Sequence, residues 1–246
     1  MNFKLVLDNN RNTFFSIKKG SSITPVSLLE NEEGVDEIKG NIIITPNKSR
    51  ERDVLFISGQ SGSGKSYYTQ AYANEYKKIY PKNSIFLFST LKSDVGSIDK
   101  IKKLKKIDIT NPLFIEDNID IEELSNSLLI FDDVDNLTNG QIKDQVWKIM
   151  TDCLFTGRHH NISVIVTYHT LSDWKRTRAI LNECNYIVVF PSVSGSLKTL
   201  FDKYLGMNNK DVKKIMNLDT RSVTICKTYP KVILYDKGAY ILRPTY

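Results

Sequence analysis

The segment Val54–Ser66 reads VLFISGQSGSGKS and is the most informative stretch of the chain. Its second part, Gly59–Ser66, matches the phosphate-loop pattern G-x-x-x-x-G-K-[ST] at every fixed position. The apolar run Val54–Ser58 predicts a strand before the loop, and Tyr67–Tyr80 predicts a helix that Pro81 stops. Because a strand, a glycine-rich loop and a helix in this order form phosphate-binding sites, the segment predicts a nucleotide-binding α/β domain.

The loop supplies flexible backbone and a positive charge. Glycine lets the backbone curve around a phosphate with its N–H groups pointing inward. We expect Lys65 to reach the β- and γ-phosphates of ATP and the Ser66 hydroxyl to ligate Mg²⁺. The alternative is an ordinary turn rich in glycine and serine. The predicted cofactors are ATP and Mg²⁺, and the predicted cofactor-binding residues are Gly59, Gln60, Ser61, Gly62, Ser63, Gly64, Lys65, Ser66 and Tyr67.

A pair of carboxylates follows a second apolar strand. Leu128–Phe131 predicts this strand, and Asp132 and Asp133 come directly after it. We expect Asp132 to hold the Mg²⁺ hydration shell and Asp133 to polarise the attacking water. Two solvated carboxylates at a strand end are the alternative. A consecutive acidic pair favours hydrolysis that drives mechanical work over a small-molecule kinase.

Two further candidates flank a third strand, predicted over Ile162–Thr167. Arg158 precedes this strand, where an arginine can project from a subunit edge and neutralise the γ-phosphate of a neighbour. His169 follows it and is expected beside the nucleotide, because ligands of open α/β sheets bind at the carboxyl edge. His159 and His160 read as a polar loop.

The rest of the chain predicts strands that alternate with helices, which is typical of a mostly parallel, doubly wound sheet. We expect a β-rich lead-in over residues 1–50 and a core over residues 51–246. The predicted strands of the lead-in are Phe3–Leu7, Phe14–Lys18 and Asn41–Thr45. The predicted elements of the core are strands Ile85–Ser89 and Tyr186–Phe190, helices near 140–156, 196–205 and 209–217, and a hairpin of Val223–Tyr229 with Val232–Tyr235.

Composition bounds the possible partners. The 246 residues include 34 Lys and Arg against 28 Asp and Glu, a net charge of +6 that suits a polyanion. The basic segments Lys100–Lys106, Lys175–Arg178 and Lys210–Lys214 suit phosphate contact, and Trp174 next to the second could stack on a base. No apolar run approaches the roughly 18 residues of a membrane span, so no membrane partner is expected. Three cysteines indicate a reducing, intracellular compartment.

The motifs GQSGSGKS, LLIFDDV and GRHHNISVIVTYH, in this order and spacing, resemble the FtsK–HerA superfamily of DNA-pumping ATPases. More narrowly, they resemble the genome-packaging ATPases of poxviruses, giant DNA viruses and virophages. The resemblance covers about residues 50–206. It implies a P-loop NTPase fold of RecA/ASCE type, with Asp133 as the catalytic acid and Arg158 as the arginine finger. Two departures are Asp133, where the superfamily usually has glutamate, and His169, where it usually has a glutamine sensor.

The resemblance also implies a function and partners. These are ATP hydrolysis that translocates double-stranded DNA into a viral capsid, a ring oligomer (hexamer or pentamer), and docking at a capsid vertex. The implied locations are viral factories in the host cytoplasm and the virion. Two alternatives remain open: a small P-loop kinase of nucleosides or metabolites, and a non-catalytic nucleotide-gated scaffold.

Overall fold

The computed structural model describes residues 3–7, 13–30, 34–48, 50–90, 97–111, 113–116, 119–169, 174–191 and 194–243. The chain divides into two units, Arg50–Cys184 and a second one formed by Met1–Ser49 together with Asn185–Tyr246. Residues 185–246, which the sequence-based division gave to the core, instead cluster with the N-terminal strands. The reason is pairing between distant parts of the sequence: β4 (Glu37–Lys39) pairs with β14 (Gly238–Leu242), and the Ile241 N–H donates to the Asp36 carbonyl.

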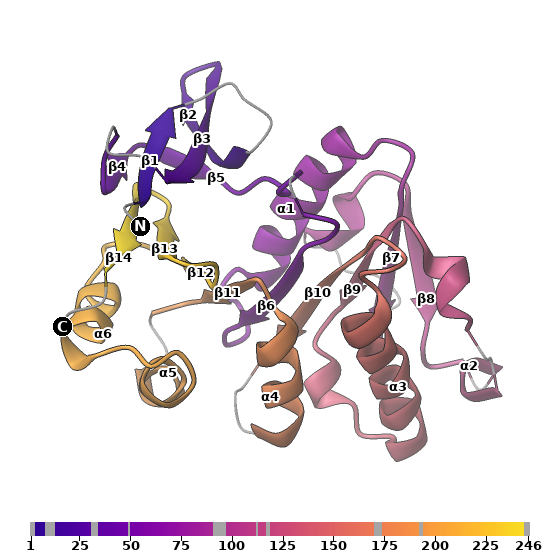
Figure 1. Cartoon of the computed structure of the whole chain (residues 1–246). Helices are drawn as coiled ribbons and strands as arrows, with labels where there is room; N and C mark the ends of the chain where they lie inside the picture. Colours follow the sequence, from indigo (N-terminus) through magenta and orange to yellow (C-terminus); the bar gives the residue numbers. More distant parts are fainter. Residues whose placement is uncertain are drawn as a thin grey trace. The chain divides into compact units, whose positions relative to one another are not determined.

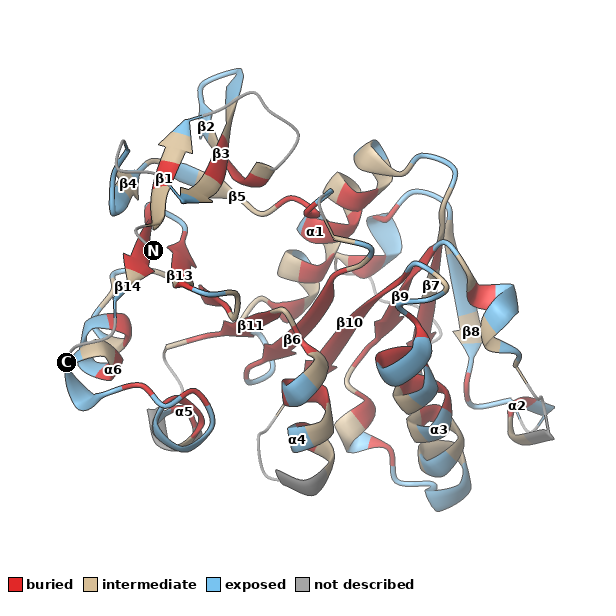
Figure 2. Cartoon of the chain, in the orientation of Figure 1, coloured by how far each residue is buried: buried red, intermediate tan, exposed pale blue. Residues whose placement is uncertain are grey.

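The unit Arg50–Cys184 is built on a parallel sheet in the order β6-β10-β9-β7-β8 (Figure 1). Its strands are β6 (Val54–Ser58), β10 (Ile162–Tyr168), β9 (Ser127–Phe131), β7 (Ser84–Ser89) and β8 (Leu104–Asp108). Every residue of β6, β9 and β10 is buried, as Figure 2 shows in red. A parallel sheet covered on both faces requires such continuous apolar strands, which explains why the sequence predicts them.

Helices cover both faces of this sheet. They are α1 (Lys65–Ile79), α2 (Leu113–Glu116), α3 (Gly140–Thr156) and α4 (Trp174–Glu183), with short 3₁₀ turns η1 (Ile98–Lys100), η2 (Ile121–Leu124) and η3 (Val134–Asn136). The connection β6-α1-β7 advances across the sheet, whereas β9-α3-β10 steps back towards β6. Right-handed crossovers therefore put α1 and α3 on opposite faces. Figure 1 shows α1 on one face and both α3 and α4 on the other.

Both ends of α3 are capped by side chains. At its start, the Asn139 side chain accepts hydrogen bonds from the backbone N–H groups of Gln141 and Ile142 at 3.0 and 3.2 Å. At its end, the guanidinium of Arg52 donates to the carbonyls of Cys153 and Leu154. A cation there satisfies free carbonyls and opposes the helix dipole. Burial of this guanidinium lowers the pKa of Arg52.

The second unit is antiparallel. One sheet has the order β1-β3-β2-β5, from β1 (Phe3–Leu7), β3 (Ser22–Glu30), β2 (Thr13–Lys19) and β5 (Asn41–Ile43). The other strands run in the order β4-β14-β13-β12-β11, from β4 (Glu37–Lys39), β14 (Gly238–Leu242), β13 (Lys231–Tyr235), β12 (Val223–Cys226) and β11 (Tyr186–Val189). Its helices are α5 (Ser194–Thr199), which continues as the π-helix η4 (Leu200–Tyr204), and α6 (Asn209–Met216).

The predicted elements are found with shifts of a few residues at their ends. The parallel sheet, the strand-rich N-terminus and the β12–β13 hairpin are confirmed. Several elements were missed. Among them, the strand β3 contains Pro25, β8 overlaps the lysine-rich run, and α4 carries the second basic segment. The short elements β4, α2 and β14 were not predicted either.

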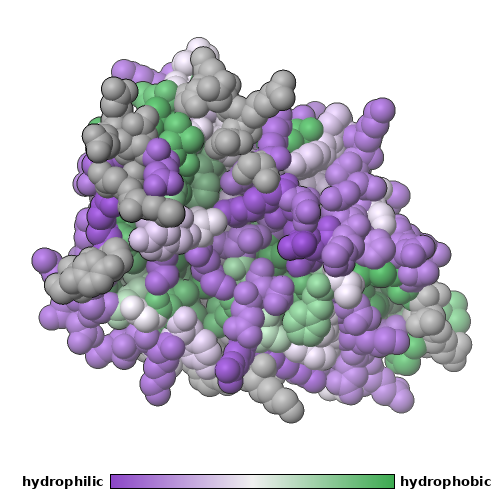
Figure 3. All heavy atoms as spheres, viewed as in Figure 1, coloured by the Kyte–Doolittle hydropathy of each residue, from purple (hydrophilic) through white to green (hydrophobic). Residues whose placement is uncertain are grey.

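Hydrophilic residues dominate the face of the molecule drawn in Figure 3, and the hydrophobic residues on it lie in separate areas. Large hydrophobic side chains exposed within the described ranges include Leu7, Ile23, Leu113, Phe155 and Tyr229. In the same ranges, each helix is too short or too polar to cross a membrane.

Candidate functional site

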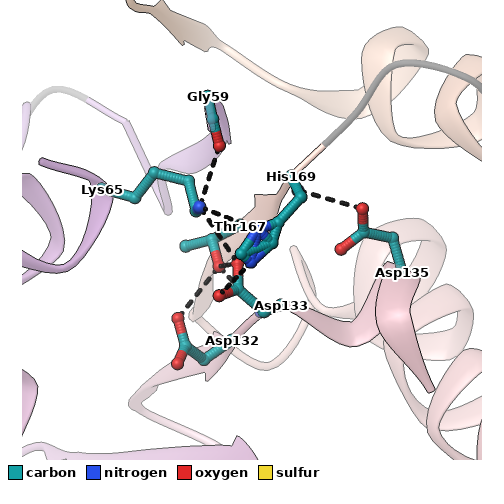
Figure 4. Close-up of polar contacts among 7 residues, drawn as sticks. All are labelled: Gly59, Lys65, Asp132, Asp133, Asp135, Thr167 and His169. Carbon is teal, nitrogen blue, oxygen red and sulfur yellow. Dashed lines mark hydrogen bonds and ion pairs between the residues drawn. The ribbon is translucent and has the colours of Figure 1, made fainter. Parts of the chain in front are cut away.

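The predicted site residues converge because three neighbouring parallel strands end at one edge of the sheet. β6 leads into Gly59, β9 into Asp132 and β10 into His169. Since β10 pairs with both β6 and β9, the residues that follow these strands lie next to one another. Figure 4 shows the resulting cluster of polar side chains, which occupies the carboxyl edge where α/β sheets bind ligands.

The phosphate loop has the backbone that its glycines permit. Gly62 and Gly64 have φ angles of 74° and 119°, a region that side chains other than glycine rarely adopt. A Cβ at Gly62 would meet no described atom within 4 Å, so its φ rather than crowding requires glycine there. The Gly59 N–H donates to the Tyr168 carbonyl at 3.1 Å and ties the loop to β10. Helix α1 then begins at Lys65, and no described side chain caps it.

Lys65 is buried and its ammonium faces three acceptors. Its Nζ donates to the Gly59 carbonyl at 2.8 Å, and it lies 3.3 Å from His169 Nδ1 and 3.4 Å from Asp133 Oδ1. An ammonium has three protons, and these partners match them in number. The lysine therefore already points into the space between the loop and the carboxylates (Figure 4), where a phosphate would compete for the same protons.

His169 is held on three sides. Its Nε2 lies 2.9 Å from Asp133 Oδ2, and its backbone N–H donates to Asp135 Oδ2 at 3.0 Å. Because the Lys65 ammonium can only donate, Nδ1 must accept, and the ring proton is assigned to Nε2, which donates to Asp133. The imidazole thus links the loop lysine to the predicted water-polarising carboxylate.

Thr167 is a member of the cluster that sequence reasoning missed. Its side chain is fully buried, and its Oγ1 lies 3.0 Å from Asp132 Oδ1 and 3.1 Å from Asp133 Oδ1. The same oxygen accepts a hydrogen bond from the Asp133 N–H at 2.8 Å. Asp133 has a φ of 49°, a left-handed conformation that aspartate tolerates better than most residues. The signal available was a hydroxyl near the end of β10, two residues before His169, because alternate residues of extended chain lie on the same side.

The remaining predicted residues show whether the site can hold ATP and Mg²⁺. Asp132 is 8% exposed, and its carboxylate lies at the end of β9 facing the site. Ser66 follows Lys65 in the first turn of α1 and is half-buried. Mg²⁺ in such sites takes few protein ligands and otherwise binds water and phosphate oxygens, so a hydroxyl and one carboxylate suit it. Gln60 and Ser61 are exposed, and the Tyr67 side chain is 70% exposed.

Arg158 does not join this cluster. It lies in the turn between α3 and β10, before the amino end of β10, whereas the cluster follows the carboxyl end. A strand of this length spans about 20 Å at roughly 3.3 Å per residue. The Arg158 Nε lies 3.0 Å from Glu51 Oε2, and both side chains are largely exposed. The arginine therefore lies too far away to act on a nucleotide bound by its own chain.

The basic segments divide between the two units. The exposed lysines at and before β8 are Lys100, Lys102, Lys103, Lys105 and Lys106, and those of α6 are Lys210, Lys213 and Lys214. On α4, Arg176 pairs with Asp144 at 3.2 Å and lies over the Trp147 ring, so it helps to hold α4 against α3. The side chains of Trp174 and Lys175, which we had singled out for nucleic-acid contact, lie outside the described residues.

Comparison with known proteins finds a relative from a virophage. No protein-family model matches it. The uncharacterized protein V3 of the Sputnik virophage is 37% identical to the chain over 219 residues, which cover 87% of each protein. The chain belongs to the V3 family. This confirms the part of the expected resemblance that concerns virophages.

Solved structures resemble the V3-family chain in fold. The crystal structure of B204, the DNA-packaging ATPase of Sulfolobus turreted icosahedral virus, aligns with a TM-score of 0.52 and 16% identity over 80% of the chain and 99% of B204. The packaging NTPase B204 of Sulfolobus turreted icosahedral virus 2, in complex with AMPPCP, aligns with a TM-score of 0.49 and 14% identity over 80% of the chain and all of B204. At such identity the likeness concerns the fold alone, and the first alignment confirms the predicted architecture for the V3-family chain.

Proposed function

We propose that this V3-family protein is an ATP-hydrolysing motor that translocates double-stranded DNA into a viral capsid. The observation that carries the proposal is the convergence of Lys65, Asp132, Asp133 and His169 behind a complete phosphate loop. Membership of a virophage family and the fold shared with a DNA-packaging ATPase support it. The net charge of +6 suits a DNA partner.

In the proposed reaction the phosphate loop and Asp132 bind the triphosphate together with Mg²⁺. The loop amides and Lys65 contact its phosphates, and Ser66 and Asp132 would hold Mg²⁺. Mg²⁺ held by these residues would supply positive charge that offsets the negative charge developing on the phosphates. Because Lys65 already lies in hydrogen-bond range of the loop and of His169, it needs little reorganisation to meet a phosphate.

Asp133 is proposed to orient the attacking water and accept its proton. A carboxylate near the reacting centre does this only when its orientation is fixed. The His169 imidazole holds one carboxylate oxygen at 2.9 Å, and the other lies 3.4 Å from Lys65. A bound phosphate that recruits the Lys65 ammonium would remove its contact with that second oxygen. Asp133 would then be held by His169 and Thr167, with one oxygen more accessible to water.

Arg158 is proposed to act on the nucleotide of a neighbouring subunit in a ring. Its distance from the cluster of its own chain excludes a role there, and its exposure suits contact with a second copy. Heterologous contacts repeated around an axis generate such rings, with six or five subunits expected here. Docking of the ring at a capsid vertex, and residence in viral factories of the host cytoplasm and in virions, belong to the same proposal.

The function is tested by measuring ATP hydrolysis by the assembled protein with and without double-stranded DNA. We expect stimulation by DNA of any sequence, with a dependence on salt that reflects phosphate contacts. The variant Lys65→Ala is the matched control, because it loses the ammonium that faces the phosphates. Hydrolysis that ignores DNA contradicts the motor. Transfer of the γ-phosphate to nucleosides or nucleotides would instead support the kinase.

A further inference from the structure

The hydroxyl of Thr167 contacts both carboxylates of the proposed hydrolytic site and nothing in that function assigns it a role. Its oxygen lies 3.0 Å from Asp132 Oδ1, 3.1 Å from Asp133 Oδ1 and 2.8 Å from the Asp133 backbone nitrogen. The Thr167 side chain is fully buried, and all three partners of its hydroxyl belong to Asp132 or Asp133. A threonine that served only to fill a strand would need no such partners, because Val would pack equally well there.

The geometry of these contacts defines what the hydroxyl can do. Its oxygen accepts from the Asp133 N–H and so stabilises the left-handed backbone of Asp133, whose φ is 49°. Its single proton can be donated to only one carboxylate at a time. Because both acceptors lie within 3.1 Å, the hydroxyl bridges the two carboxylates and limits how far they can move apart.

We infer that Thr167 is the positioning residue of the site: its hydroxyl fixes the backbone of Asp133 and aligns the water-polarising carboxylate of Asp133 with the metal-holding carboxylate of Asp132. The inference rests on the proposed function. It also accounts for Asp133 at a position where glutamate was expected. The left-handed backbone and the short side chain keep that carboxylate within reach of the Thr167 hydroxyl, which a longer side chain would overshoot.

The test compares Thr167→Val, which keeps the shape and removes the hydroxyl, with Thr167→Ser, which keeps the hydroxyl. We measure kcat for ATP hydrolysis, Kd for a non-hydrolysable ATP analogue with Mg²⁺, and the midpoint of thermal unfolding. Displacement of a catalytic group by about 1 Å can lower the reaction rate on the order of 100-fold. We therefore expect Thr167→Val to lower kcat about 100-fold and to change Kd less than about threefold. Thr167→Ser should restore kcat to within about fivefold of the wild type.

Thr151→Val is the matched control. Its hydroxyl is also buried but has no hydrogen-bond partner among the described residues, and it lies in α3. We expect kcat and Kd of this variant to equal those of the wild type. If Thr167→Val does not fold, the pair Thr167→Ala and Thr167→Ser decides, because only the second keeps the hydroxyl.

Three results overturn the inference: a Thr167→Val kcat close to that of the wild type, a Thr167→Ser variant as impaired as Thr167→Val or Thr167→Ala, or losses of kcat and of nucleotide affinity in parallel. Failure of the proposed function looks different. In that case the wild-type protein itself does not hydrolyse ATP, or hydrolyses it at a rate that does not respond to DNA, whatever residue stands at position 167.

Discussion

The imidazole of His169 joins Asp133 to Lys65, with Nε2 2.9 Å from Asp133 Oδ2 and Nδ1 3.3 Å from Lys65 Nζ. Glutamine can reproduce both contacts, because its amide carries a donor and an acceptor. We predict that His169→Gln keeps kcat for ATP hydrolysis within about fivefold of the wild type. His169→Ala should lower it about 10- to 100-fold, since a hydrogen bond to a charged group contributes about 1.5–3 kcal/mol. A fully active His169→Ala variant would show that the link has no part in turnover.

The carboxylate of Asp133 is expected to be needed for ATP hydrolysis and not for ATP binding. Asparagine has nearly the same shape and tolerates the left-handed backbone at this position, so Asp133→Asn should fold normally. It cannot accept a proton from water. We predict that the variant binds ATP analogues with nearly wild-type affinity while kcat falls about 10²- to 10⁴-fold, the range of general-base effects. Normal hydrolysis by Asp133→Asn would remove Asp133 from the mechanism.

Gly157, which precedes Arg158, has a structural role that can be tested independently of the arginine. A Cβ at Gly157 would lie 2.3 Å from the Cys153 carbonyl oxygen and 2.8 Å from Arg52 Nη1, at the capped end of α3. We predict that Gly157→Ala lowers the free energy of unfolding by about 1–3 kcal/mol, as overpacking does.

Gly140 at the other end of α3 is the control for that substitution. A Cβ there would meet no described atom within 4 Å, so Gly140→Ala should leave stability unchanged or raise it by up to about 1 kcal/mol. Thermal unfolding of both variants checks the pair. Equal stabilities of the two variants would mean that the end of α3 can relax around the added methyl group.

The cysteines are predicted to be unreactive in the folded protein. Cys153, Cys184 and Cys226 are buried, and burial raises the pKa of the Cys153 thiol to about 12. Since only the thiolate is nucleophilic, alkylation at pH 8 should modify none of them before denaturation and all of them after it. Rapid alkylation of the native protein, measured by mass spectrometry, would contradict this burial.

The same shift makes stability depend on alkaline pH. The folded state holds the Cys153 proton more tightly than the unfolded chain, whose thiol has a pKa near 9. The stabilisation that this proton provides is complete below about pH 9 and is lost as the pH rises towards 12. Cys153→Ser should therefore show a weaker decline of the unfolding free energy over this window than the wild type.

Much of the site could be predicted because its chemistry depends on residue types at fixed spacings. Lys65 and Ser66 belong to a loop pattern, and Asp132 and Asp133 follow an apolar strand whose burial makes it legible. Thr167 could not be found in the same way, since a threonine in a β-branched strand looks like any other core residue. Its role appears only when β10 is known to lie between β6 and β9.

The sequence predicted the buried strands of the parallel sheet correctly, and it missed elements that are exposed. The strands β6, β9 and β10 are continuous apolar runs, whereas β8 is an edge strand whose exposed lysines hide it within a charge run. The strand β3 contains Pro25, and a proline within a run of residues argues against a strand there. The grouping of residues 185–246 with the N-terminal strands depends on pairing distant in sequence, which local patterns do not encode.

Triplex displacement tests the central claim, DNA translocation driven by ATP, most directly. A third strand annealed to double-stranded DNA is released only if a motor moves along the duplex and strips it. We predict release by the wild-type protein with ATP, on duplexes of unrelated sequence, and none with Lys65→Ala, Asp133→Asn or a non-hydrolysable analogue. ATP hydrolysis stimulated by DNA without any release of the third strand would contradict the account.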